Sequence, residues 1–98
     1  MKNIVSVKNI RNFYNTHKKS ETPLKMWVAI AKKAEWNTPH DVKRDYRNAS
    51  IINEDRVVFN IKGNDYRLIV SINYETQYIY IRFIGTHKEY DKVDPKTV

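Results

Sequence analysis

Residues 58–69 read VFNIKGNDYRLI and decide the fold, because two alternating apolar stretches flank the pair Gly63-Asn64. Side chains of a strand alternate between its two faces, and Gly-Asn is a typical two-residue hairpin turn. The stretch therefore predicts two antiparallel strands, with Asn60 opposite Arg67.

The strand pattern continues to the end of the apolar part of the chain. Residues 56–62, 66–73 and 78–86 are rich in Val, Ile, Tyr and Phe, and Glu75-Thr76 supplies a weaker second turn. This second hairpin pairs Ile72 with Ile79, Val70 with Ile81, Leu68 with Phe83 and Arg67 with Ile84.

These two registers agree and sort the side chains into two faces. The predicted core face holds Val57, Phe59, Ile61, Leu68, Val70, Ile72, Ile79, Ile81 and Phe83. The opposite face gathers cations, amides and aromatics around a few apolar residues: Arg56, Val58, Asn60, Lys62, Arg67, Ile69, Ser71, Asn73, Tyr80, Arg82 and Ile84. A slip of one residue would expose the whole core face, so the register is well specified.

The first half of the chain reads as helical, and residues 3–5 as a short strand or a lead-in. Apolar residues at helical spacing include Trp27, which we assign to the core, and Trp36, which is core or a partner contact. The predicted helices run from Ser6 to about Lys19, from Pro23 (capped by Thr22) to near Trp36, and from Pro39 (capped by Thr38) to about Tyr46. We therefore expect one α+β domain over residues 1–98, with helices packed on one face of an antiparallel sheet.

The charge is large and unevenly distributed. Eighteen Lys and Arg against eleven Asp and Glu give a net charge of +7, and all of this positive excess lies in residues 1–49. A basic excess favours nucleic acid or an acidic protein as partner. The short basic run Lys43, Arg44 and Arg47 is either a solvated helix face or a contact to an RNA backbone.

Several classes of protein are excluded or disfavoured. The chain has no cysteine, and its three histidines are scattered with no ligand spacing, so we expect no disulfide, no metal and no cofactor. No uncharged run is long enough for a bilayer, and the start lacks the apolar region of a secretory signal. We expect a cytoplasmic protein without membrane contact.

The end of the third strand places a histidine near cations. In the predicted register Thr86 lies opposite Asp65, so His87 emerges close to Lys62 and Arg67. Thr86 could cap a short terminal helix that contains His87 and Tyr90. A histidine beside two cations could transfer protons at a phosphate, although a lone surface histidine is more often a bystander.

The combination of residues 58–69 with residues 80–91, YIRFIGTHKEYD, resembles the HigB toxins of bacterial toxin–antitoxin pairs, within the RelE-like group of mRNA interferases. The resemblance implies a RelE-like fold and a metal-independent endoribonuclease that cuts mRNA, in most such toxins on the translating ribosome. It also implies a HigA-like helix-turn-helix antitoxin as partner, with operator DNA bound only through the toxin–antitoxin complex.

The resemblance also implies roles for particular residues. Arg67 matches the phosphate-binding arginine of the group, and His87 and Tyr90 match its carboxy-terminal pair for proton transfer and base stacking. Lys62, Arg82 and Asn60 would add RNA contacts, as would the basic run Lys43, Arg44 and Arg47. The general base stays unassigned, since the direction of Glu89 depends on the terminal helix.

Two other functions remain open from the sequence. The same sheet face could serve a non-catalytic RNA-binding domain, in which cations hold phosphates and aromatics stack on bases. The basic surface could instead serve only an acidic protein partner.

Overall fold

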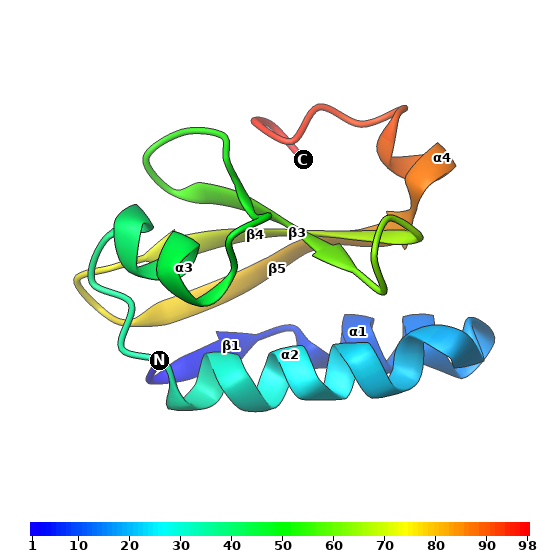
Figure 1. Ribbon diagram of the computed structural model, residues 1–98, viewed down its shortest axis with the longest axis horizontal. Helices are drawn as coiled ribbons and strands as arrows, with labels where there is room; N and C mark the ends of the chain where they lie inside the picture. Colours follow the sequence, from blue (N-terminus) through cyan, green and yellow to red (C-terminus); the bar gives the residue numbers. More distant parts are fainter.

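The computed structural model describes all residues, 1–98, and has an α+β architecture, which confirms the predicted class (Figure 1). Its mixed sheet has the strand order β1-β5-β4-β3-β2, with β1 parallel to β5 and the other pairs antiparallel. The strands are β1 Asn3–Val5, β2 Ser50–Ile51, β3 Arg56–Ile61, β4 Tyr66–Asn73 and β5 Tyr78–Thr86. The helices are α1 Val7–Thr16, α2 Glu21–Lys33, α3 Pro39–Asp45 and α4 His87–Tyr90, with a 3-10 turn, η1, at Lys18–Ser20.

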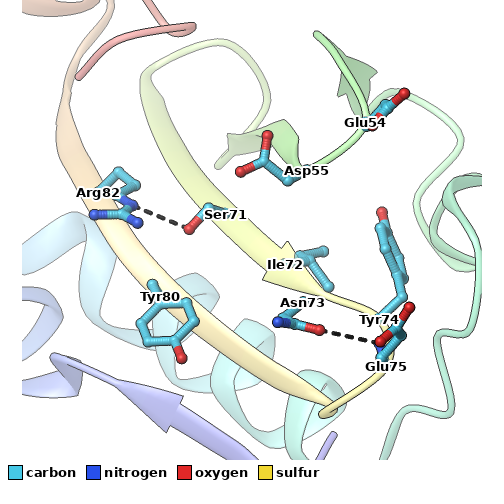
Figure 2. A pocket seen from close by; sticks show the side chains of 9 residues that line it. All are labelled: Glu54, Asp55, Ser71, Ile72, Asn73, Tyr74, Glu75, Tyr80 and Arg82. Atoms are coloured by element: carbon cyan, nitrogen blue, oxygen red, sulfur yellow. Dashed lines mark hydrogen bonds between the residues drawn. The ribbon is translucent and has the colours of Figure 1, made fainter.

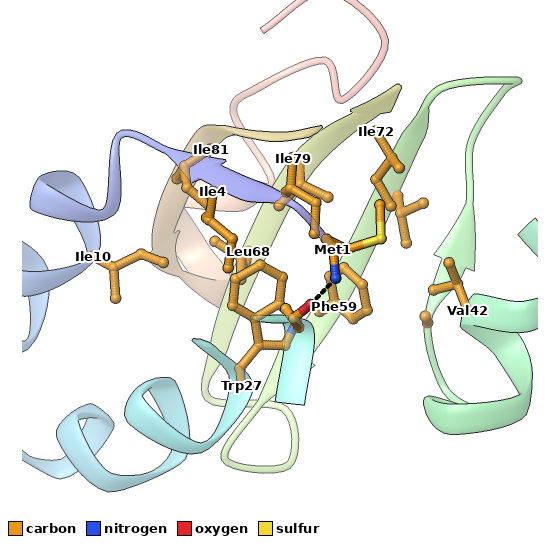
Figure 3. Packing of buried hydrophobic residues seen from close by; sticks show 14 of the residues in the cluster. Met1, Ile4, Ile10, Trp27, Val42, Phe59, Leu68, Ile72, Ile79 and Ile81 are labelled. Atoms are coloured by element: carbon orange, nitrogen blue, oxygen red, sulfur yellow. Dashed lines mark hydrogen bonds between the residues drawn. The ribbon is translucent and has the colours of Figure 1, made fainter. Parts of the chain in front are cut away.

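The core lies between the sheet and helices α1 and α2, which run along one of its faces (Figure 1). Trp27 and Trp36 are both buried in it, and both rings pack against Phe59. Figure 3 shows Trp27 beside Phe59 among the buried apolar residues. The Trp36 indole N–H donates to the Asp45 carboxylate at 2.9 Å. Eight of the nine residues predicted for the core face belong to this cluster: Val57, Phe59, Ile61, Leu68, Val70, Ile72, Ile79 and Ile81.

Three of the predicted helix boundaries are wrong. The first helix ends at Thr16, and α2 begins at Glu21 and stops at Lys33, so neither Thr22 nor Pro23 opens it. The turn η1 leads straight into α2, and Pro23 is tolerated there because the first N–H groups of a helix have no partner inside it. The third helix agrees: Thr38 and Asp41 form the capping box of α3.

The first hairpin has the predicted register, and the second departs from it halfway. Asn60 pairs with Arg67 as expected, and the turn has positive φ at Lys62 and Gly63. Between Ile69 and Val70 the pairing with β5 then shifts by one residue, because a bulge in β5 leaves Arg82 without a partner on β4. The predicted pairs Leu68–Phe83 and Arg67–Ile84 are therefore wrong, as is the placement of Thr86 opposite Asp65; the observed pairs are Ile69–Phe83, Leu68–Ile84, Arg67–Gly85 and Tyr66–Thr86.

The bulge also exchanges two side chains between the faces. Ile84 packs against the core, and Phe83 lies on the opposite face, contrary to the prediction for both. The Phe83 ring lies over Gly85, where an added Cβ would be 2.5 Å from Phe83 Cζ. Glycine at position 85 therefore makes room for the ring.

The face away from α1 and α2, here called the outer face, is only partly open. Val58 and Ile69 are buried on it and form a row with Phe83 across β3, β4 and β5. Residues 91–98, here called the tail, cross this side of the sheet after α4 (Figure 1). Arg56 donates to the main-chain oxygens of Pro95 (3.2 Å) and Val98 (2.8 Å), so it holds the tail and is not an open cation.

Candidate active site

Arg67 and Tyr90 meet on the outer face, at the end of the sheet where β3 turns into β4. We call this place the hairpin end. Arg67 sits on β4 between Asn60 of β3 and Gly85 of β5. Its guanidinium donates to the main-chain oxygens of Asn64 (3.0 Å) and Tyr66 (3.3 Å), and its Cζ lies 5.7 Å from the centre of the Tyr90 ring. These two carbonyl contacts and the ring orient the guanidinium, which has five N–H donors in all.

His87 lies beside the same hairpin because its main chain is tied to it. The His87 N–H donates to the Asp65 carbonyl at 3.1 Å, and Lys62 Nζ is 3.1 Å from the Asp65 carboxylate. The half-exposed His87 imidazole has Nδ1 3.4 Å from an Asp91 oxygen. A carboxylate at one ring nitrogen orients an imidazole and leaves the other nitrogen for a substrate. The hairpin thus brings Lys62, Arg67, His87 and Tyr90 to one end of the sheet.

The short helix α4 carries His87 and Tyr90 and is held by a complete capping box. The Thr86 side chain accepts from the Glu89 N–H (3.2 Å), and the Glu89 carboxylate accepts from the Thr86 N–H (2.8 Å). That main-chain hydrogen bond is the largest cause that lowers the pKa of Glu89. The Glu89 side chain therefore points back to Thr86 at the start of α4 and holds the helix.

Arg82 belongs to a different part of the outer face. Its Nε donates to the Ser71 hydroxyl at 3.0 Å, and its Cζ lies 5.7 Å from the centre of the Tyr80 ring. The row of Val58, Ile69 and Phe83 separates it from Arg67 along the strands. The structure therefore does not group Arg82 with the residues of the hairpin end.

The three cations of the basic run on and after α3 differ in their partners. Lys43 Nζ donates to the carbonyls of Arg47 (2.7 Å) and Ala49 (2.8 Å), and Arg44 pairs with Asp41 at 3.3 Å. Arg47 is exposed and makes no ion pair with its side chain. Only Arg47 among the three has its charge unengaged by the protein.

Two contacts of the candidate residues were not predicted from the sequence. Asp91, the partner of His87, could have been found from its i, i+4 spacing in the predicted terminal helix. Tyr80 was placed on the same face as Arg82, but the contact of its ring with this guanidinium was not predicted.

The hairpin end combines a fixed cation, an imidazole with a carboxylate partner and an aromatic ring. Such a set can bind a phosphodiester, move a proton at one of its oxygens and stack on a base. No three His, Cys, Asp or Glu side chains are arranged to hold a metal ion. None of the helices has the length and apolar character needed to cross a bilayer.

Comparisons with known proteins agree on one family. The model of the HigB_toxin family, described as the RelE-like toxic component of a toxin–antitoxin system, matches residues 20–93. The "mRNA interferase toxin HigB" of Escherichia coli (strain K12) is 50% identical over 34 residues, which is 35% of this chain and 33% of that protein. Proteins named "mRNA interferase HigB" from Escherichia coli O157:H7 and Shigella flexneri match with the same values. The aligned stretch thus spans about a third of the length of these relatives.

Proposed function

This chain belongs to the HigB family of RelE-like toxins, and on that footing we propose that it is an endoribonuclease that cleaves mRNA during translation on the ribosome. The observation that carries the proposal is the group of Arg67, His87 and Tyr90 at the hairpin end. Similarity to relatives named mRNA interferases supports the choice of RNA as substrate.

The proposed reaction needs no metal and uses the RNA's own 2′-hydroxyl. The 2′-oxygen attacks the adjacent phosphorus, the bond from phosphorus to the 5′-oxygen breaks, and the products are a 2′,3′-cyclic phosphate and a 5′-hydroxyl. The 2′-hydroxyl loses a proton and the leaving 5′-oxygen gains one, so the site needs a base and an acid.

Arg67 and His87 have complementary parts in this reaction. The Arg67 guanidinium stabilises the charge that develops on the phosphate oxygens. The His87 imidazole, oriented by Asp91, moves one of the two protons. Tyr90 stacks on a base beside the scissile bond and keeps the guanidinium in place.

The proposal extends to partners and setting. We expect residues 1–98 to act as one toxin domain in the cytoplasm, with ribosomal RNA as the docking surface. Since the family is the toxic component of toxin–antitoxin systems, an antitoxin partner follows from it. We propose that this partner is a HigA-like helix-turn-helix protein and that operator DNA is bound only through the complex.

The direct test is cleavage of a defined mRNA in a translation extract, with the new 5′ ends mapped by primer extension. Arg67→Ala should lower the cleavage rate about 100- to 1000-fold, because it removes a charge that acts at the transition state. His87→Ala should also abolish most cleavage. Arg11→Ala is the matched control, since Arg11 is an exposed arginine of α1 outside the hairpin end.

The outcome also separates cleavage from simple RNA binding. A folded Arg67→Ala protein that cuts like wild type would contradict the assignment of Arg67. If no variant and no wild-type protein cuts RNA while salt-dependent RNA binding persists, the chain is a non-catalytic RNA-binding domain.

A further inference from the structure

A hollow of about 560 Å³ opens on the outer face at the end of β4 that lies farthest from the β3–β4 turn (Figure 2). Its size is in the range of sites for small ligands. The residues that matter for its chemistry are Glu54, Asp55, Ser71, Glu75, Tyr80 and Arg82. We call this cavity the acidic hollow.

One wall of the acidic hollow includes Tyr80 and Arg82. The Arg82 guanidinium lies over the Tyr80 ring, and its Nε is bound to the hydroxyl of the buried Ser71 at 3.0 Å. A guanidinium held by this hydrogen bond beside an aromatic ring offers a planar surface on which a third planar group can stack. Aromatic rings and guanidinium planes are the usual stacking partners of unpaired RNA bases.

The other side of the acidic hollow carries three exposed carboxylates. Glu54 and Glu75 form no ion pair, and Asp55 only approaches Arg56 Nε at 3.8 Å. Ionised carboxylates only accept hydrogen bonds, so a ligand that binds beside them has to offer donors. Three negative charges against the single Arg82 disfavour a phosphate here and favour a group with N–H donors on its edge.

We infer that the acidic hollow binds a purine base that carries an exocyclic amino group, from the RNA that the proposed function assumes. The ring stacks on Tyr80 and Arg82, and the amino group donates to a carboxylate of Glu54, Asp55 or Glu75. Uracil is rejected, because its single imide N–H lies between two carbonyl oxygens that would face the carboxylates. The acidic hollow is then a base-selecting subsite, distinct from the hairpin end where the bond breaks.

The test measures binding of labelled 2′-O-methyl hexanucleotides by fluorescence anisotropy with wild-type protein, since blocked 2′-oxygens prevent cleavage. One central adenosine or guanosine in hexauridylate should tighten binding about tenfold, as expected for one added stacked and hydrogen-bonded base. Purine riboside lacks the amino group and should lose most of the gain. The double substitution Glu54→Gln, Glu75→Gln should abolish the preference for adenosine over purine riboside, and Tyr80→Ala should weaken binding of every purine.

Glu35→Gln is the charge-matched control, because Glu35 is exposed and lies outside the acidic hollow. It should keep the preference. The inference would be overturned by equal binding of adenosine and purine riboside, or by a preference that survives the double substitution. It would also be overturned if the hollow binds a lysine-rich peptide and no purine. If all hexanucleotides bind alike while mRNA is still cut, this inference fails and the proposed function stands. If none binds and nothing is cut, the proposed function itself fails.

Discussion

At the residue scale, Lys43 and Arg47 show how two nearby cations can differ in their roles. Lys43 donates to two main-chain carbonyls that follow α3, whereas the Arg47 side chain is exposed and unpaired. Lys43→Ala should therefore lower the free energy of unfolding by about 1 kcal/mol. Arg47→Ala should change it by less than about 0.5 kcal/mol and should weaken RNA binding instead.

Urea unfolding and anisotropy with a single-stranded RNA, both run on each variant, separate the two effects. Arg47→Ala should also reduce the dependence of binding on salt by roughly one phosphate contact. A loss of stability in Arg47→Ala together with unchanged RNA binding would show that this division of roles is wrong.

The candidate residues were predictable to the extent that they depend on local pairing. Arg67 and Asn60 could be placed side by side because a tight turn leaves one register that buries the apolar face. The role of Arg56 could not be foreseen, since its partners Pro95 and Val98 are about forty positions away in the chain. Contacts of this kind leave no periodic signal in the sequence.

At the scale of elements, α4 is a four-residue helix whose position depends on its cap. The pKa of Glu89 is lowered chiefly by the hydrogen bond from the Thr86 N–H. A lowered pKa in the folded state means that the carboxylate stabilises α4 fully above its ordinary value of 4.5. This contribution is lost as pH falls through the lower pKa of the folded state. Acid should therefore loosen α4 and release His87 and Tyr90 from the hairpin.

Amide hydrogen exchange of residues 86–90 along a pH titration, corrected for the intrinsic rate, measures this release. Thr86→Ala should speed exchange at all pH values, because loss of such a cap costs about 1 kcal/mol. Glu89→Gln should remove the acid-induced step. If the step persists in Glu89→Gln, a group other than Glu89 is responsible.

The bulge in β5 could not be predicted from the alternation of side chains along the strand. Strict alternation placed Phe83 in the core, but one extra residue near Arg82 turns Ile84 inward and Phe83 outward. Both residues are apolar, so either assignment satisfies the alternation pattern equally well. The feature that distinguishes them is Gly85, whose missing side chain admits the Phe83 ring.

At the scale of the whole molecule, charge and chemistry lie in different halves. The excess of +7 belongs to residues 1–49, whereas the candidate catalytic residues come from the strands and α4, where charges balance. A positive helical half suits docking onto a large RNA surface, because such attraction acts over a distance and needs no fixed geometry. The sheet and its hairpin provide the fixed geometry that cleavage needs.

The proposed function requires that the hairpin end cuts mRNA through Arg67. It is tested most directly by inducing the protein in a bacterial cell and mapping mRNA 5′ ends genome-wide, with Arg67→Ala beside wild type at equal protein levels. We expect growth arrest and new 5′-hydroxyl ends inside coding frames for wild type, and neither for Arg67→Ala. Identical 5′-end profiles for the two proteins would contradict it.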